Sequence, residues 1–304
     1  MICAENVTMK FGSFTALDSL NCQIPRGCVY GLVGSNGAGK STFLRLIAGV
    51  YRPAKGRVTI EGVPVYDAPE AKERVAFVPD ELFFLPHANM HRMAAFYRAN
   101  YRTFSEERYA ELVAAFDLNP KANLATFSKG MRRQAAIILA LSTMPDYILF
   151  DETFDGLDPV MRNLVKRVIY DDVETRGTTA VISSHSLRDL EDTCDQLALL
   201  HKGGLIFESD IENLKTSLFK VQIAFSQPFD RDILDGIEVL NWNRKGSVAN
   251  AIVRGDRAQV QKQLTDKKPL LLDLLPLTLE EIFLYEMEAL GYVFDDVLRR
   301  EEKA

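Results

Sequence analysis

The chain has 304 residues, of which 47% are hydrophobic, and its 36 Lys and Arg residues against 42 Asp and Glu residues give a net charge of −6. This length suits one large globular domain with a smaller one attached, and an acidic balance without a basic block argues against a nucleic-acid partner. The four cysteines lack C-x-x-C spacing and no basic-then-apolar leader is evident, so we expect a reducing, cytoplasmic compartment and no signal peptide.

Short β-branched and aromatic runs alternate with stretches of helical periodicity, which indicates an α/β fold with a largely parallel sheet. The first strands are expected at Ile2–Val7 and Leu20–Ile24. A turn at Pro25–Gly27 leads into a buried strand, Cys28–Val33, which stops at a glycine-rich loop. A helix is predicted to follow this loop over Ser41–Ala48.

The glycine-rich loop reads G-S-N-G-A-G-K-S-T over residues 34–42 and contains the phosphate-loop pattern G-x-x-x-x-G-K-[ST] between a predicted strand and a predicted helix. Its glycines let successive N–H groups point at a phosphate, aided by the positive end of the helix. Lys40 is expected to reach the β- and γ-phosphates, and Ser41 to place its hydroxyl on Mg²⁺. The pattern alone leaves a chance strand-to-helix turn open. The expected nucleotide-binding residues of the loop are Gly34, Ser35, Asn36, Gly37, Ala38, Gly39, Lys40, Ser41 and Thr42.

Residues from His87 to Ala125 lose the strand pattern and are predicted to form two or three helices inserted into the α/β domain, including Glu106–Phe116. The longest apolar run, Ala135–Met144, has half of the roughly 20 residues that a membrane-spanning helix requires. Any membrane role is therefore expected to come through a partner. The α/β alternation then resumes with a strand, a helix and a strand at Tyr147–Asp151, Pro159–Glu174 and Thr178–Ser183.

The strand at Tyr147–Asp151 ends in two carboxylates, Asp151 and Glu152. If it lies beside the phosphate loop, Asp151 can hold Mg²⁺ through water, and Glu152 can polarise an attacking water molecule. Acidic pairs at strand ends are ordinarily solvated turns. After a phosphate loop, this pair favours nucleotide hydrolysis.

The segment F-S-K-G-M-R-R-Q over residues 127–134 resembles the signature of ATP-binding-cassette (ABC) ATPases. Ser128 and Gly130 match the common L-S-G-G-Q form, whereas Lys129 and Met131 depart from it, and similar S-K-G-M forms occur in the ABC-2-type exporter branch with bacitracin-resistance and YtrB-like cassettes. Ser128 is expected to cap a helix that begins near Gly130 and so to form an anion site. A plain helix cap is the alternative interpretation.

Further matches follow in the order of the family's motifs. Gly156-Leu157-Asp158 resembles the D-loop at the dimer interface, His185 resembles the switch histidine that contacts the γ-phosphate, and Phe11 resembles the aromatic residue that stacks on adenine. Taken singly, they are equally consistent with a turn, a solvated loop residue and a core residue. Asp80 stands where most cassettes have Gln, and its carboxylate could still approach the metal.

The resemblance implies a P-loop NTPase fold over residues 1–215, with a RecA-like core, an N-terminal β subdomain and an inserted helical subdomain at 81–126. It implies a head-to-tail dimer with ATP and Mg²⁺ held between copies, in which Glu152, His185 and Lys40 are catalytic. It further implies polytopic permease subunits on a separate chain at the inner face of the membrane, and export of peptides, antimicrobials or other amphipathic compounds. A non-transport ABC ATPase, for example of the iron–sulfur assembly type, is the alternative, and a GTPase or small-molecule kinase fits the motifs less well.

After Leu214 the order of elements changes, and we place a boundary near Lys215. Residues 216–304 are predicted to form a small α+β accessory or dimerisation domain. Its segment Pro276–Phe283 resembles one that closes many export cassettes, either as a dimer contact or as an ordinary core-facing helix. We expect the charged tail Arg299–Ala304 to be frayed. The remaining predicted elements are strands at 219–225, 249–253 and 270–275 and helices at 257–264 and 278–290.

Overall fold

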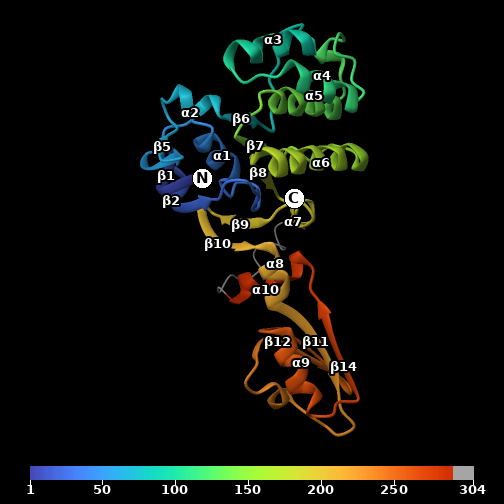
Figure 1. The fold of residues 1–304 in the computed structure, drawn as a ribbon. Helices are drawn as coiled ribbons and strands as arrows, with labels where there is room; N and C mark the ends of the chain where they lie inside the picture. The colour runs from blue at the N-terminus through green and yellow to red at the C-terminus, as the bar shows by residue number, and fades with distance from the viewer. Residues whose placement is uncertain (290–304) are drawn as a thin grey trace. The chain divides into compact units, whose positions relative to one another are not determined.

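A computed structural model describes residues 1–289 and divides the chain into two units, Met1–Glu208 and Ser209–Ala304 (Figure 1). The boundary predicted near Lys215 lies within the helix α8, Ile211–Ser217, just after this division. The tail predicted to be frayed, Arg299–Ala304, lies outside the described residues.

The first unit begins with an antiparallel sheet in the strand order β2-β1-β4-β5. Its first two strands form a hairpin whose ends pair at Phe11 and Phe14, across a turn in which Gly12 has a φ of 60°. Both strands are therefore longer than predicted, because the pairing continues past several register shifts between Ala4 and Lys10 that interrupt the alternating pattern. The bounds are β1 Ile2–Phe11, β2 Phe14–Ile24, β4 Lys55–Ile60 and β5 Val63–Pro64.

The centre of the first unit is a six-stranded sheet in the order β10-β9-β3-β8-β7-β6. The pairs β3–β8, β3–β9, β7–β8 and β6–β7 are parallel. Every residue of β3, β7 and β8 is buried, as expected for parallel strands covered on both faces. The bounds are β3 Val29–Val33, β6 Val75–Val78, β7 Tyr147–Asp151, β8 Thr179–Ser184, β9 Gln196–His201 and β10 Gly204–Asp210.

The helix α1, Lys40–Ile47, shares one hydrophobic core with both sheets. Phe43 and Leu44 of this helix are fully buried in a cluster that includes Leu17 of the antiparallel sheet and Tyr30 of the parallel sheet. This packing fixes where α1 begins, and therefore where the preceding loop lies. The other helices of the first unit, apart from α3 to α5, are α2 Pro69–Glu73, α6 Pro159–Arg176 and α7 Leu187–Glu191.

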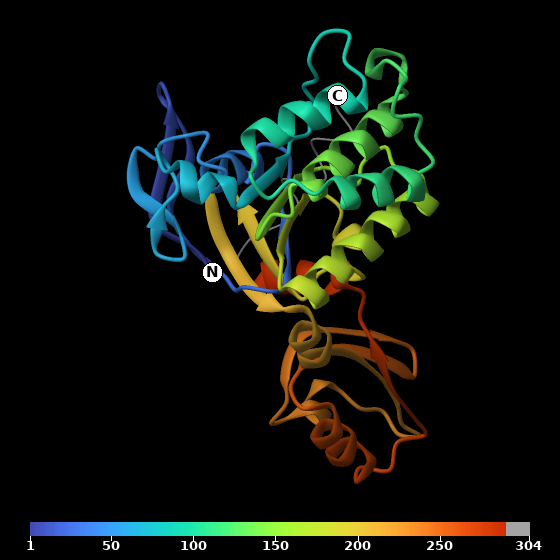
Figure 2. The ribbon, with the colours of Figure 1, turned by 45° about the horizontal axis from the view of Figure 1, so that its top comes forward.

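Three helices follow β6 and stand together (Figures 1 and 2): α3 and α4 lie within the segment predicted as an insertion, residues 81–126, whereas α5 begins after it. Each begins at a polar residue whose side chain accepts a backbone N–H, namely Asn89, Ser105 and Ser128. The predicted helix Glu106–Phe116 is present as α4 and ends one residue earlier. The bounds are α3 Met90–Asn100, α4 Glu106–Ala115, the 3₁₀ turn η1 Leu124–Thr126, and α5 Lys129–Ser142.

The second unit contains an antiparallel sheet in the order β12-β13-β11-β14. Its inward residues, such as Val221 and Val253, pack with Val260 and Leu264 of α9. The strand β12 is absent from our prediction, because its polar sequence E-V-L-N-W-N-R-K shows little alternation. The bounds are β11 Leu218–Ala224, η2 Arg231–Leu234, β12 Glu238–Lys245, β13 Val248–Arg254, α9 Arg257–Thr265, β14 Leu271–Pro276 and α10 Leu279–Ala289.

None of the helices within residues 1–289 combines the length and the apolar character needed to cross a bilayer.

Candidate nucleotide site

The loop between β3 and α1 has the backbone that a phosphate cradle requires. Gly37 and Gly39 have φ values of 80° and 109°, which side chains rarely allow. A Cβ atom on Gly39 would lie 2.7 Å from Leu17 Cδ2, and one on Gly34 would lie 2.4 Å from the carbonyl oxygen of Leu200. Glycine is therefore required at both positions, and the loop is held tightly against the strands behind it.

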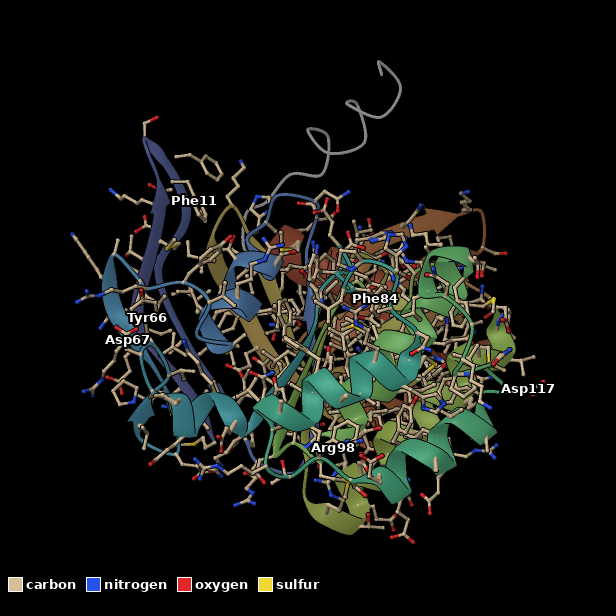
Figure 3. The ribbon with its side chains drawn as sticks, turned by 90° about the horizontal axis from the view of Figure 1, so that it is seen from above. Phe11, Tyr66, Asp67, Phe84, Arg98 and Asp117 are labelled. Carbon is tan, nitrogen blue, oxygen red and sulfur yellow. The ribbon has the colours of Figure 1, made fainter. Side chains whose placement is uncertain are left out.

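A cavity of about 280 Å³ opens beside this loop. It brings the phosphate loop together with the hairpin β1–β2, with Asp80 after β6 and with Glu152 after β7. Phe11 is 44% exposed, packs edge-on against Tyr51 at 5.4 Å, and lies on the antiparallel hairpin (Figure 3). The residues that line the cavity are Phe11, Phe14, Ala16, Asn36, Gly37, Ala38, Gly39, Lys40, Ser41, Thr42, Asp80 and Glu152.

Lys40, Glu152 and His185 form a chain of charged and polar contacts at this cavity. Lys40 is only 5% exposed, and its Nζ atom donates to the carbonyl of Gly34 at 2.7 Å and lies 3.0 Å from Glu152 Oε1. The other oxygen of Glu152 lies 3.0 Å from His185 Nδ1. Burial alone would raise the pKa of Glu152, but Lys40 and His185 outweigh it and hold this pKa below its usual value. Glu152 is therefore an ionised carboxylate at neutral pH.

Asp151 is fully buried one residue earlier, at the end of β7. Its Oδ1 atom accepts hydrogen bonds from Ser41 Oγ and Ser183 Oγ, both at 2.9 Å, whereas its Oδ2 atom is buried without a partner among the described residues. Burial raises the pKa of Asp151, and the two serine hydroxyls act in the opposite direction. An orphaned carboxylate oxygen beside the phosphate-loop serine fits a hard cation such as Mg²⁺, which Ser41 and Asp151 would hold.

Ser128, in the segment that resembles the ABC signature, caps a helix as predicted. Ser128 Oγ accepts the backbone N–H of Met131 at 3.2 Å and caps α5, which begins at Lys129. A Cβ atom on Gly130 would lie 3.1 Å from the carbonyl oxygen of Gly156, so the D-loop packs on the first turn of this helix. Asp158 caps α6 in the same way. Neither Ser128 nor Asp158 lines the cavity at the phosphate loop.

Two contacts at the site have no counterpart in our sequence analysis. The guanidinium of Arg133 on α5 bonds to Asp80 and to backbone carbonyls after β7. Asp155 Oδ2 lies 3.6 Å from His185 Nδ1, the same nitrogen that Glu152 contacts. The one sequence signal for the Arg133 contacts is an arginine just before an apolar helical run. Nothing in the sequence signals the contact between Asp155 and His185. Asp80 itself is 54% exposed, and its role as a metal ligand stays a prediction.

A glycine loop with a buried lysine, set beside an aspartate that can hold a cation and an ionised glutamate, defines a phosphate-loop nucleoside triphosphatase. Comparison with known proteins specifies the class further. A family model described as "ABC transporter" matches residues 17–155. The ATP-binding protein YtrB of Bacillus subtilis is 28% identical over 287 residues, which cover 93% of this chain and 97% of YtrB.

The linearmycin resistance ATP-binding protein LnrL of B. subtilis is 30% identical over 212 residues and covers 68% of each chain. A solved structure of the ATP-binding subunit of an ABC transporter superimposes with a TM-score of 0.66 at 25% identity, over 71% of this chain and 92% of that one. The chain belongs to the ABC transporter family, as an ATP-binding and ATP-hydrolysing subunit. The predicted fold class, ATP as ligand and ATPase activity are confirmed, and the transport subunit is favoured over the non-transport alternative.

Proposed function

We propose that two copies of this chain close head to tail around two molecules of ATP with Mg²⁺, and that closure drives separate membrane subunits to export amphipathic compounds. The observation that carries the proposal is an incomplete site. The cavity at the phosphate loop gathers Lys40 and Glu152, yet the anion site at the capped start of α5 does not line it. Ser128 is exposed, so a second copy can present it to the γ-phosphate.

In this proposal each residue has one task during hydrolysis. Lys40 exchanges the loop carbonyls that it contacts for phosphate oxygens, since a charge-assisted bond to phosphate is the stronger one. Glu152 orients a water molecule and accepts its proton, and His185 holds the Glu152 carboxylate in place. Bound Mg²⁺ would neutralise phosphate charge beside Ser41 and Asp151. Phe11 stacks on the adenine from the exposed hairpin.

The proposed membrane partner is a polytopic permease that docks on the insertion at residues 81–126 and holds the chain at the inner face of the membrane. This part of the described chain exposes large apolar side chains, with Phe83 at 78% and Phe96 at 48%. LnrL is named for resistance to linearmycin, which supports export of antimicrobial or similar amphipathic cargo. We assign nucleotide binding to residues 1–215, and an accessory or dimerisation role to residues 216–304.

Glu152→Gln tests the dimer. The neutral amide can still orient water but cannot take up its proton, so we expect turnover to fall by about 10²–10³-fold while ATP stays bound. Light scattering after size-exclusion chromatography should then show a dimer that depends on ATP and Mg²⁺. A variant that combines Glu152→Gln with Ser128→Arg is the matched control and should stay monomeric. A Glu152→Gln protein that remains monomeric at saturating ATP, even with its membrane subunits present, contradicts the proposal.

A further inference from the structure

Arg133 is the largest fully buried side chain in the described part of the protein. It lies on α5, five residues after Ser128, with 1% of its surface exposed, and the apolar run that starts at Ala135 follows it. A buried guanidinium is costly unless a counter-charge and hydrogen bonds compensate it. The groups that bond to the guanidinium therefore indicate the structural role of Arg133.

These partners come from two segments that border the nucleotide cavity. Nη1 donates to the carbonyl oxygen of Glu152 at 2.7 Å and to that of Asp155. Nη2 donates to a carboxylate oxygen of Asp80, the sole carboxylate within ion-pair distance of Arg133 among residues 1–289. The planar guanidinium group of Arg133 thus connects the loop after β7 to the segment after β6.

The loop after β7 depends on this support. Glu152 has a φ of 48°, in the left-handed region that residues other than glycine rarely adopt. Its N–H donates to Ser183 Oγ at 3.1 Å and its carbonyl accepts from Arg133, so both of its peptide groups are held. This backbone conformation directs the carboxylate to its position between Lys40 and His185.

We propose that Arg133 is a positioning residue for Glu152 and that Asp80 is its counter-ion, so that Asp80 acts on hydrolysis through Arg133 and not as a ligand of the metal. The inference rests on the proposed role of Glu152. Asp80 is half-exposed and precedes the insertion at residues 81–126, where the ring of Phe84 contacts Arg132, the residue before Arg133. A partner that moves this segment removes the counter-charge of Arg133, loosens the loop after β7 and slows turnover.

A double-mutant cycle with Asp80→Gln and Arg133→Gln tests the pair in the full chain. Each single change leaves a charge or a set of buried carbonyls without a partner, and we expect each to lower kcat by about 10–100-fold. The double variant has already lost the guanidinium contacts to the loop carbonyls through Arg133→Gln, so the added loss of Asp80 should lower kcat little further. Arg133→Lys keeps the positive charge but loses the planar guanidinium that reaches all of these partners, so its kcat should be low as well. Arg167→Gln, at an exposed position of α6, is the matched control and should change kcat by less than about threefold.

Three further readouts separate the outcomes. The Mg²⁺ concentration that gives half-maximal activity should stay the same in Asp80→Gln, whereas a tenfold rise with kcat restored at saturating Mg²⁺ would make Asp80 a metal ligand. Adding Asp80→Gln to Glu152→Gln should lower the residual turnover no further. If Arg133→Gln does not fold, Asp80→Asn measured alone still distinguishes a loss in kcat from a loss in ATP affinity, and a loss confined to affinity overturns the inference. Additive single effects, in a protein whose Glu152→Gln variant still forms the ATP-dependent dimer, overturn this inference and leave the proposed function intact.

Discussion

The six-stranded sheet of the first unit and the antiparallel sheet of the second unit place their polar groups in opposite ways. In the first unit β3, β7 and β8 are buried throughout, and charged and polar side chains collect where these strands end, at Lys40, Glu152 and His185. In the second unit polar side chains spread over one face of the antiparallel sheet, where Lys220, Asn243 and others line an open groove of about 280 Å³. Buried parallel strands leave room for polar side chains only where the strands end, whereas an antiparallel sheet can carry polar side chains along its whole solvent-facing side.

Because of this difference, we expect mutations in the two units to have different effects. At the end of the parallel sheet the polar groups bind one another, and Lys40 and Glu152 are largely shielded from solvent, so removal of one leaves others unpaired. In the antiparallel sheet the polar face is solvated, and stability comes from the apolar face that packs on α9. We therefore expect the largest effects on nucleotide binding from charges of the first unit, and the largest effects on the stability of the second unit from its apolar residues.

Lys40→Ala should have the largest effect. The change removes the cation that would face the phosphates and takes one of its two charged or polar partners from the half-buried carboxylate of Glu152. We expect ATP affinity to fall by about 10³-fold, which corresponds to about 4 kcal/mol. Binding of a fluorescent ATP analogue measures this loss. Lys121→Ala, on an exposed loop, is the control and should bind normally. An affinity within threefold of the unmodified protein would show that the charge is not needed there.

Leu264→Ala is the matching test in the second unit. Leu264 is fully buried between α9 and the sheet, and its truncation should lower the free energy of unfolding of this unit by about 3 kcal/mol. The chain has one tryptophan, Trp242, which packs on the same core, so its fluorescence during urea unfolding reports this unit selectively.

Two controls complete the Leu264→Ala experiment. Leu270→Ala, at a position 73% exposed, should change the unfolding free energy by less than about 0.5 kcal/mol. ATP binding by Leu264→Ala should be unchanged. A loss of ATP affinity in this variant would contradict the expectation that the core of the second unit does not affect nucleotide binding.

The same contrast explains what the sequence could predict. The phosphate loop and the acidic pair at Asp151 and Glu152 are local patterns, each tied to the end of a strongly apolar strand, so their positions could be predicted from spacing alone. The capping of α5 by Ser128 is local as well. The polar β12 offered no such pattern, since an edge strand with a solvated face needs little apolar alternation.

Long-range contacts of the site were beyond prediction. Arg133 reaches Asp80 across 53 positions of sequence, and Asp151 accepts a hydrogen bond from Ser183 across 32. Such pairs depend on the order of strands in the sheet, which places β7 between β6 and β8. No composition or periodicity encodes that order, so these contacts required the folded chain.

Asp151→Asn has the smallest expected effect and tests the buried charge at the end of β7 most directly. Without nucleotide and metal, the variant should be more stable than the unmodified protein by about 1 kcal/mol, or about 2–4 °C in the midpoint of thermal unfolding. The amide oxygen can still accept from Ser41 and Ser183, while a buried negative charge is lost. Circular dichroism in the presence of a chelator measures the midpoint, because most of the described helical residues belong to the first unit.

The pH dependence of this gain follows from the raised pKa of Asp151, which burial causes. An acid whose pKa is raised on folding leaves stability intact below its ordinary pKa and lowers it as the pH rises through the raised value. The advantage of Asp151→Asn should therefore be present at neutral pH and shrink as the solution is acidified. With saturating ATP and Mg²⁺ the order should reverse, because ligand binding stabilises only the protein that retains the carboxylate. A variant less stable than the unmodified protein at neutral pH without ligands would mean that the Asp151 charge is already compensated before any cation binds.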